Sequence, residues 1–458
     1  MINKEFFGSK LPAKIKPGTK ILFACVPADG HFNPLTGLAV YLKEQGCDVR
    51  WYTSANYEEK VRKLGLQFYP LVKAMDIAVS TDPDIIFPER KNYKTQVSRL
   101  KFDLINVFIL RGPEYFEDIL DIHQQFPFEL MIADITFGAI PFVKERMNIP
   151  VLSINIVPLP ETSRDLPPPG LGMLPSKSAF GKARQAFLRY VADKLLFAKP
   201  NKVLEETLGK YGISSEGANI FDIQIRKSSA VLQSGTPGFE YERSDMSPHI
   251  HFAGPLLPHS AKKSSAPWFN EKLRSYNKVI LVTQGTVEKD VNKIIVPTLE
   301  AFKNSDCLVI VTTGGSQTAE LRNRYPQENF IIEDFIPFGD VMPYADVYVT
   351  NGGYGGVLLS IQNNLPLVVA GVHEGKLEIN ARVGYFKLGI NLRTEKPSAA
   401  AIRKSVDKIL SDDSYRKNVK ALSREFRQYD PNQVAVRVIS QLLPSFTPVR
   451  EKAYEVIY

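Results

Sequence analysis

The chain has few cysteines and no long apolar run. Its three cysteines lie in apolar surroundings, and their odd number argues against a disulfide framework and for reduced core thiols: Cys25, Cys47 and Cys307. No window reaches the roughly 20 apolar residues that a membrane-spanning helix needs. Met1 to Lys20 lacks the apolar segment of a signal peptide. We therefore expect a cytoplasmic protein with at most peripheral membrane contact.

Clusters of metal ligands are also missing. His249 and His251 would share one face of a strand, but no third ligand lies near them in the sequence. Asp82-Pro83-Asp84 spells the DxD triplet by which some transferases hold a metal, yet no strand precedes it and Pro83 favours a turn. We therefore predict no metal site and no bound cofactor.

The positive charge is not concentrated in one region. The net charge is +8, but residues of both signs are mixed along the chain, so a nucleic-acid-binding patch is not expected. With 458 residues, 44% of them hydrophobic and 23% charged, the composition is typical of a globular protein of two or three domains.

The most informative stretch is rich in glycine and runs from Thr350 to Ser360. The residues Asp346 to Val349 before it predict a strand, and those after it predict a helix and a further strand. A glycine turn at the start of a helix presents unpaired N–H groups and the positive end of the helix dipole, which favours a phosphate. A turn that only packs a helix on a sheet is the alternative.

The chain opens as a βαβ unit, with a strand at Lys20 to Val26 and a helix that begins near Leu35. His31 falls in the loop between them, at the edge of a parallel sheet where ligands bind. Asp134 ends another predicted strand and so meets the same edge. Its carboxylate can either orient His31 or cap the following helix.

Segment 166–175 is rich in proline and glycine and predicts a long surface loop. The basic segment 177–202 then predicts a helix with an apolar surface. Such a helix can close over a cleft for a small molecule or dock on a membrane, and the sequence favours the cleft.

A second series of strands and helices follows a linker that includes Phe252 to Ala266. The predicted fold class is therefore α/β, with two Rossmann-like doubly wound domains facing across a cleft. We place the first domain at 1–257, the linker proper at 258–266 and the second domain at 267–430. A helical segment, 431–458, completes the chain and can pack back on the first domain.

Together these motifs resemble the UDP-glycosyltransferase family, in its microbial macrolide-glycosyltransferase-like branch, which has the GT-B architecture. Pro27 to Pro34 is similar to the family's GHxNP opening, whose histidine is the general base, here His31. Asp134 matches the aspartate that orients this base. Gln284-Gly285-Thr286 resembles the (S/T)xG(S/T) turn, and Asn351 to Pro366 resembles the donor signature.

Several donor positions depart from that signature. Asn351 stands where the family usually has a phosphate-contacting histidine, and Leu359 replaces the glutamate that holds the ribose. Phe335 to Phe338 keeps an aromatic residue beside the nucleobase but not an amide. Lys376-Leu377 replaces the Asp-Gln pair that reads the sugar, a role that Glu374 or Glu378 can take over. The implied donor-binding set is Gly285, Thr286, Phe335, Pro337, Asn351, Gly352, Gly353, Gly355, Gly356, Glu374, Lys376 and Glu378.

The resemblance implies an inverting, metal-independent hexosyltransferase that moves a sugar from a nucleotide diphosphate donor, UDP-glucose, to a hydroxyl of an apolar natural product, phenol or lipid. His31 would take the proton of that hydroxyl, and Asp134 would hold the imidazole. A nucleotide-sugar epimerase or hydrolase of the same fold is one alternative, and a nucleotide-binding protein without catalysis is another.

Overall fold

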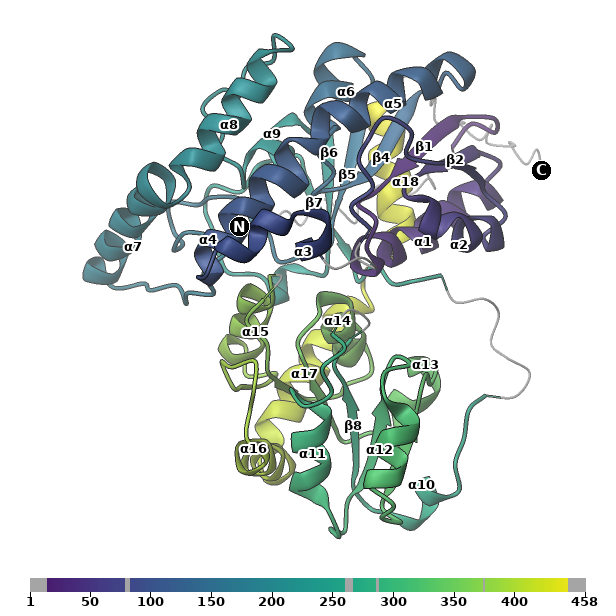
Figure 1. Cartoon of the computed structure of the whole chain (residues 1–458), viewed down its shortest axis with the longest axis vertical. Helices are drawn as coiled ribbons and strands as arrows, with labels where there is room; N and C mark the ends of the chain where they lie inside the picture. Colours follow the sequence, from purple (N-terminus) through teal and green to yellow (C-terminus); the bar gives the residue numbers. More distant parts are fainter. Residues whose placement is uncertain (1–14, 79–82, 260–266, 286–287, 374, 444–458) are drawn as a thin grey trace, which may run out of the picture.

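The computed structural model describes residues 15–78, 83–259, 267–285, 288–373 and 375–443. These residues form two α/β units, each built on a parallel sheet, which lie one above the other in Figure 1. The architecture is thus the predicted pair of Rossmann-like domains. Among the described residues no helix combines the length and the apolar character needed to cross a bilayer.

The first sheet has seven strands in the order β3-β2-β1-β4-β5-β6-β7. They are β1 Lys20–Ala24, β2 Asp48–Tyr52, β3 Gln67–Tyr69, β4 Leu130–Asp134, β5 Val151–Asn155, β6 Ala230–Ser234 and β7 Ile250–Gly254. The second sheet has six strands in the order β10-β9-β8-β11-β12-β13. They are β8 Val279–Thr283, β9 Leu308–Thr312, β10 Phe330–Glu333, β11 Val347–Thr350, β12 Leu367–Val369 and β13 Gly389–Asn391.

Helices fill the connections of both units. The first set is α1 Asp29–Glu44, α2 Glu58–Lys63, α3 Pro83–Ile86, α4 Gln96–Asp103, α5 Arg111–Gln125, α6 Ile140–Arg146, α7 Ala179–Val191, α8 Ala198–Gly209 and α9 Ile223–Lys227. The second set is α10 Lys272–Ser275, α11 Ile295–Phe302, α12 Thr318–Arg324, α13 Phe338–Val341, α14 Tyr354–Gln362, α15 Lys376–Tyr385, α16 Ala399–Ser411, α17 Asp413–Phe426 and α18 Pro431–Leu442. π-Helical turns follow α4 at Leu104–Ile109 and α7 at Ala192–Leu196.

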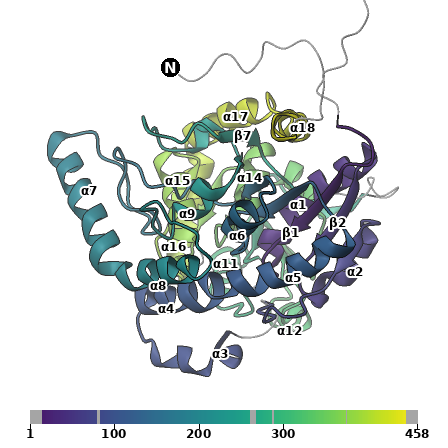
Figure 2. The ribbon, with the colours of Figure 1, turned by 90° about the horizontal axis from the view of Figure 1, so that it is seen from above.

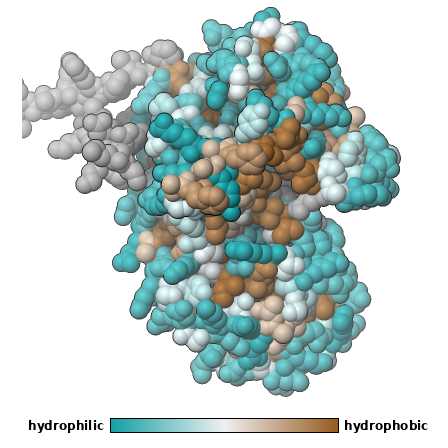
Figure 3. Space-filling view, turned by 90° about the vertical axis from the view of Figure 1, so that its left-hand side faces the viewer, coloured by the Kyte–Doolittle hydropathy of each residue, from teal (hydrophilic) through white to brown (hydrophobic). Residues whose placement is uncertain are grey.

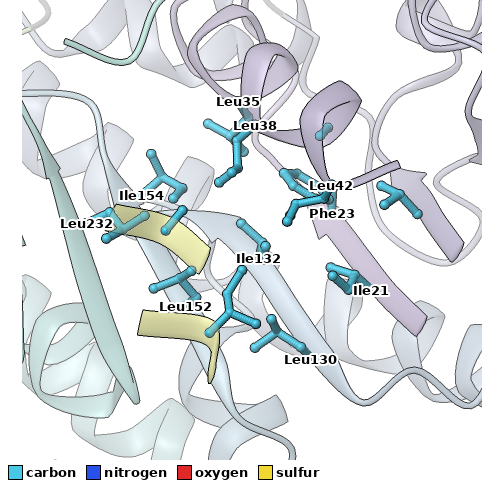
Figure 4. Packing of buried hydrophobic residues seen from close by; sticks show 14 of the residues in the cluster. Ile21, Phe23, Leu35, Leu38, Leu42, Leu130, Ile132, Leu152, Ile154 and Leu232 are labelled. Carbon is cyan, nitrogen blue, oxygen red and sulfur yellow. The ribbon is translucent and has the colours of Figure 1, made fainter. Parts of the chain in front are cut away.

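The central strands β1, β4, β5 and β6 are buried on both faces, because helices cover both faces of the sheet. Ile21 and Phe23 of β1 belong to one cluster together with Leu38 and Leu42 of α1, and Leu42 lies beside Phe23 in Figure 4. Leu22 and Ala24 point into the other, which α5 and α6 close. This two-sided burial explains why the sequences of the central strands are nearly continuous apolar runs and do not alternate between apolar and polar residues.

The last helix returns to the first unit. α17 packs on the second sheet, where Val419 and Phe426 are buried. α18 instead places Val436 and Ile439 in the same cluster as α1 and β1, and it lies among the helices of the upper unit in Figure 1. Part of the segment predicted as 431–458 lies outside the described residues.

Three local predictions were wrong. Residues Phe252 to Gly254 are not linker but the end of β7, an edge strand, and the linker residues from 260 to 266 lie outside the described residues. α1 begins at Asp29, six residues before the expected start near Leu35, because Pro34 costs it only one hydrogen bond, to the carbonyl of Gly30. His31 therefore lies in the first turn of a helix and not in a loop. The DxD triplet is not only a turn, since Pro83 starts α3, while Asp82 is outside the described residues.

Candidate functional site

His31 and Asp134 meet at the carboxyl edge of the first sheet. Because β1 and β4 are parallel neighbours, their ends bring the first turn of α1 close to the residue that ends β4. His31 Nδ1 lies 3.0 Å from Asp134 Oδ1. With Nδ1 facing the carboxylate, the proton on that nitrogen is held there and Nε2 becomes the basic nitrogen.

The Asp134 carboxylate is fully buried and strongly hydrogen-bonded. The backbone N–H of Val26 donates to Oδ2 at 2.8 Å, and the N–H of Thr136 donates to Oδ1 at 2.9 Å. The Thr136 hydroxyl also donates to Oδ1. Burial by itself raises the pKa of Asp134, but the charge of His31 and the bonds from His31, Thr136 and Val26 outweigh it, so the pKa lies below its ordinary value.

Asp84, the described half of the DxD triplet, has another partner. Its carboxylate accepts from Arg90 at 2.8 Å, and Arg90 also pairs with Asp103 at 2.7 Å. Asp84 is thus part of a surface ion-pair network. No group of three or more side chains that could hold a metal ion occurs in the part of the chain that the structure describes.

The glycine turn lies at the corresponding edge of the second sheet. β8 and β11 are paired so that Thr283 and Thr350 are opposite each other, which places Gly285 beside Asn351. The Asn351 side chain donates to the Gln284 carbonyl, and its Oδ1 accepts from the Gly353 N–H at 3.3 Å. The two predicted donor turns therefore form one structure, although Thr286 lies outside the described residues.

Gly352 is required by its surroundings. Its φ is +84°, and a Cβ there would lie 1.8 Å from Oδ1 of Asn380. Asn380 in turn donates to the Gly371 carbonyl at 3.0 Å, so α15 braces the turn. Gly353 then caps α14, and the first helical turn contains Gly355 and Gly356, while Leu359 lies one turn further along.

Phe335 lies beyond the end of β10 and is 71% exposed. A Cβ at Gly315, after β9, would lie 3.9 Å from its ring, and Pro337 caps α13 next to it. An exposed ring at the sheet edge offers a flat face on which a nucleobase can stack.

Glu378 does not present a free carboxylate. Its Oε1 accepts from the Gly172 N–H at 2.8 Å, in the proline-rich loop of the first unit, and its Oε2 pairs with Arg382 at 2.9 Å. Both of its carboxylate oxygens are thus bonded within the protein. Lys376 begins α15 and is half-buried, and Glu374 lies outside the described residues.

Further contacts that were not predicted join the two units near the site. α1, which carries His31, packs against α14, which follows the glycine turn. Tyr354 of α14 donates to the Ser234 carbonyl at 2.7 Å, and burial raises its pKa, so the hydroxyl keeps its proton. Arg382 bonds to Glu240. Asn380-Ala381-Arg382 also resembles the family's donor signature, and this resemblance is the sequence signal that could have drawn attention to Arg382.

A cavity of about 240 Å³ lies in the first unit between the proline-rich loop and the helices after it. Its walls include Thr162, Pro169, Arg189, Tyr190, Phe197 and Phe221. The mixture of aromatic and polar walls suits a small organic molecule. His31 is not among its lining residues.

Comparison with known proteins finds relatives along the whole chain. Residues 297–441 match the model for the C-terminal domain of erythromycin biosynthesis protein CIII-like proteins. The 4'-demethylrebeccamycin synthase of Lentzea aerocolonigenes is 32% identical over 93% of this chain and 100% of its own length. UDP-glucosyltransferase 1 of Beauveria bassiana is 30% identical over 89% of this chain and 91% of its own.

Solved structures show the same fold. The calicheamicin glycosyltransferase has a TM-score of 0.72 at 19% identity, with 94% of this chain and 100% of the other covered. A Streptomyces glycosyltransferase complexed with thymidine diphosphate has a TM-score of 0.61 at 16% identity, with 92% and 100% covered.

The synthase matches 93% of this chain, so the likeness extends over both units. The chain therefore belongs to the UDP-glycosyltransferase family and is a GT-B glycosyltransferase of the natural-product type.

Proposed function

We propose that this enzyme transfers glucose from UDP-glucose to a hydroxyl of an apolar small molecule, with inversion at the anomeric carbon. The proposal depends chiefly on the pairing of His31 with Asp134. His31 lies in the first turn of α1, and α1 packs against α14, the helix that follows the glycine turn. Base and phosphate cradle thus lie at the same boundary between the units. In this proposal residues 1–257 bind the acceptor and residues 267–430 bind the donor.

His31 is the proposed general base. Its Nε2 takes the proton of the acceptor hydroxyl as the oxygen attacks the anomeric carbon. Asp134 holds the tautomer that leaves Nε2 basic and stabilises the imidazolium that forms. The imidazole is 22% exposed whereas the carboxylate is inaccessible, which suits a base that meets substrate and a partner that does not.

The glycine turn is the proposed site of the diphosphate. As the anomeric carbon bonds to the acceptor oxygen, its bond to the diphosphate oxygen breaks and negative charge develops there. The N–H groups at the start of α14 and the dipole of that helix stabilise this charge. Attack on the opposite side from the leaving diphosphate inverts the anomeric centre.

UDP is the proposed nucleotide, because the relative from Beauveria bassiana is named a UDP-glucosyltransferase. The thymidine diphosphate in one structural neighbour makes TDP-glucose the competing donor. Phe335 can stack on either base. Glu374 remains the proposed sugar-reading carboxylate, since Glu378 is engaged elsewhere.

The test is a direct product analysis. Purified enzyme is incubated with UDP-glucose or TDP-glucose and a panel of phenols, hydroxylated natural products and lipid alcohols, and products are identified by mass spectrometry. We expect a new glycoside and free UDP, with the β configuration by NMR when the donor is α-linked. Glucose release without a glycoside, or an isomerised sugar nucleotide, would instead support the hydrolase or epimerase alternative.

A further inference from the structure

An ordinary surface helix packs its apolar face on the protein and exposes its polar face, whereas α7 packs on the protein through small and polar residues and exposes large apolar ones. The face that packs on the protein carries Gly181 and Gln185, both buried. Gln185 accepts from the Ser176 N–H at 2.6 Å and donates to the Asp165 carbonyl at 3.1 Å. Arg189 adds a bond to the Leu166 carbonyl at 2.5 Å. Polar bonds to the preceding loop therefore hold α7 in place.

The opposite face presents large apolar side chains to the surroundings. Phe180, Phe187, Tyr190 and Leu195, on α7 and the π-helical turn after it, are between 63% and 82% exposed. Such side chains normally fill a core, and a contiguous exposed group of them marks an interaction surface. We call these four residues the apolar face of α7. Tyr190 also lines the cavity beside the proline-rich loop, whereas Phe180, Phe187 and Leu195 do not.

The apolar face lies on the outside of the molecule. α7 is at the edge of the first unit in two perpendicular views, away from α15 and α16 (Figures 1 and 2). Figure 3 views the molecule from the side on which α7 lies. It shows brown side chains gathered near the middle of the molecule, with teal ones around them. A broad flat surface can reach this face without entering the space between the two units.

The segment that carries the apolar face is rich in basic residues, of which Lys177, Lys194 and Lys202 pair with acidic side chains. Within 177–202 the sequence has a single acidic residue, Asp193, against these basic ones: Lys177, Lys182, Arg184, Arg189, Lys194, Lys199 and Lys202. Lys182 and Arg184 are exposed on α7 itself. Exposed phenylalanines flanked by lysine and arginine are the pattern of a helix that lies in the interface of an anionic membrane.

We propose that α7 docks this enzyme on the surface of an anionic lipid bilayer. Phe180 and Phe187 enter the headgroup and acyl boundary, and Lys182 and Arg184 contact lipid phosphates. A second copy of the chain fits this surface less well, because a two-fold interface would bring the same basic strip against itself. The proposal does not depend on which sugar or acceptor the enzyme uses.

The experiment is vesicle sedimentation with the full chain. We expect binding to vesicles of phosphatidylcholine mixed with phosphatidylglycerol, little binding to phosphatidylcholine alone, and weaker binding as salt is added. The double variant Phe180→Ser/Phe187→Ser should lower the partition coefficient by about tenfold or more. Lys182→Glu/Arg184→Glu should abolish the preference for anionic vesicles.

The control is Val72→Ser/Ile85→Ser, which removes two side chains of similar exposure, 77% and 67%, from other elements. It should bind vesicles as the wild type does. The proposal is overturned if the wild type binds neither vesicle, or if the control loses as much binding as the α7 variant. It is also overturned if light scattering shows a dimer that Phe180→Ser/Phe187→Ser dissociates, because the face then serves a second copy.

Discussion

Arg382 of α15 donates two hydrogen bonds to Oε2 of Glu240, from Nη2 at 2.8 Å and from Nε at 3.1 Å. The two residues come from different units, and Arg382 is only 2% exposed. Glu240 also accepts from the Leu159 N–H at 2.8 Å. Arg382 pairs with Glu378 as well, and Glu378 accepts from the Gly172 N–H in the proline-rich loop. One buried chain of charges therefore fixes the helix that braces the glycine turn against the loop beside α7.

We expect Arg382→Ala to destabilise the protein by about 3 kcal/mol or more, because it leaves the Glu240 carboxylate buried without its main partner. Urea unfolding followed by circular dichroism measures the change. Arg403→Ala is the matched control, since Arg403 pairs with Asp407 at 2.9 Å but is well exposed, and it should cost less than about 1 kcal/mol. Equal losses in the two variants would contradict this account of the Arg382 pair.

We expect Gly352→Ala to lower the affinity for UDP, measured by calorimetry, by about tenfold or more, since its φ is +84° and a Cβ would collide with Asn380. The turn would have to shift, and its N–H groups would then no longer point at the proposed diphosphate site. The control is Gly209→Ala at the end of α8, where a Cβ meets nothing within 4 Å. Unchanged UDP affinity in Gly352→Ala would place the diphosphate elsewhere.

The parts of the site that follow a strand could be predicted from the sequence, and those that depend on contacts between the units could not. His31, Asp134 and the glycine turn each follow an apolar run, and parallel strands necessarily bring their ends to one edge. The partners of Glu378 are different in kind: Gly172 is 206 positions away, and no local pattern specifies that pairing.

The predicted fold was likewise reliable where burial is two-sided and weak where strands are short. The runs at β1, β4, β8 and β9 each have four apolar residues in a row and were found. β3 and β13 have three residues each, too few to show a pattern. β7 ends at Gly254 and Pro255 follows it, a Gly-Pro pair that is typical of a linker. The return of α18 to the first core depends on tertiary packing alone.

The stability of the protein should depend on the Asp134 carboxyl at low pH. Burial alone would raise its pKa. The charge of His31 and the hydrogen bonds from His31, Thr136 and Val26 lower the pKa by more than burial raises it, so it lies below the ordinary value of 3.8. A carboxyl with a lower pKa in the folded state stabilises the fold fully above its unfolded pKa and loses this effect as the pH falls through its folded pKa. The free-energy difference between wild type and Asp134→Asn should therefore be constant above about pH 5 and shrink below about pH 4. A difference that widens in acid would contradict the lowered pKa.

We expect turnover to be insensitive to EDTA. The proposed diphosphate site supplies backbone N–H groups and the dipole of α14, which can hold negative charge without a cation. The measurement compares initial rates in EDTA and in added Mg²⁺ or Mn²⁺. A rate that collapses in EDTA and returns with either ion would show that a metal holds the leaving diphosphate.

The assignment of His31 as the base predicts a loss of turnover without a loss of donor binding. His31→Ala should fold and bind UDP through the second unit, while the rate of glycoside formation with an alcohol acceptor falls by about 10²-fold or more. Asp134→Asn should also lower kcat at nearly unchanged UDP affinity, since it no longer enforces the tautomer with a basic Nε2. His249→Ala, which removes a half-buried imidazole bonded to the Ile225 carbonyl, is the control and should keep wild-type kcat.

The choice of acceptor separates loss of a base from general damage to the site. A strongly acidic phenol is partly ionised before it binds, so it needs less help from His31 than an alcohol does. The ratio of wild-type to His31→Ala kcat should therefore be clearly smaller for the phenol, whereas a distorted site would slow both acceptors alike. Rates for the two acceptors, measured beside the UDP affinity of each variant, decide the question. If His31→Ala kept wild-type turnover with the alcohol, the proton would have to leave by another group.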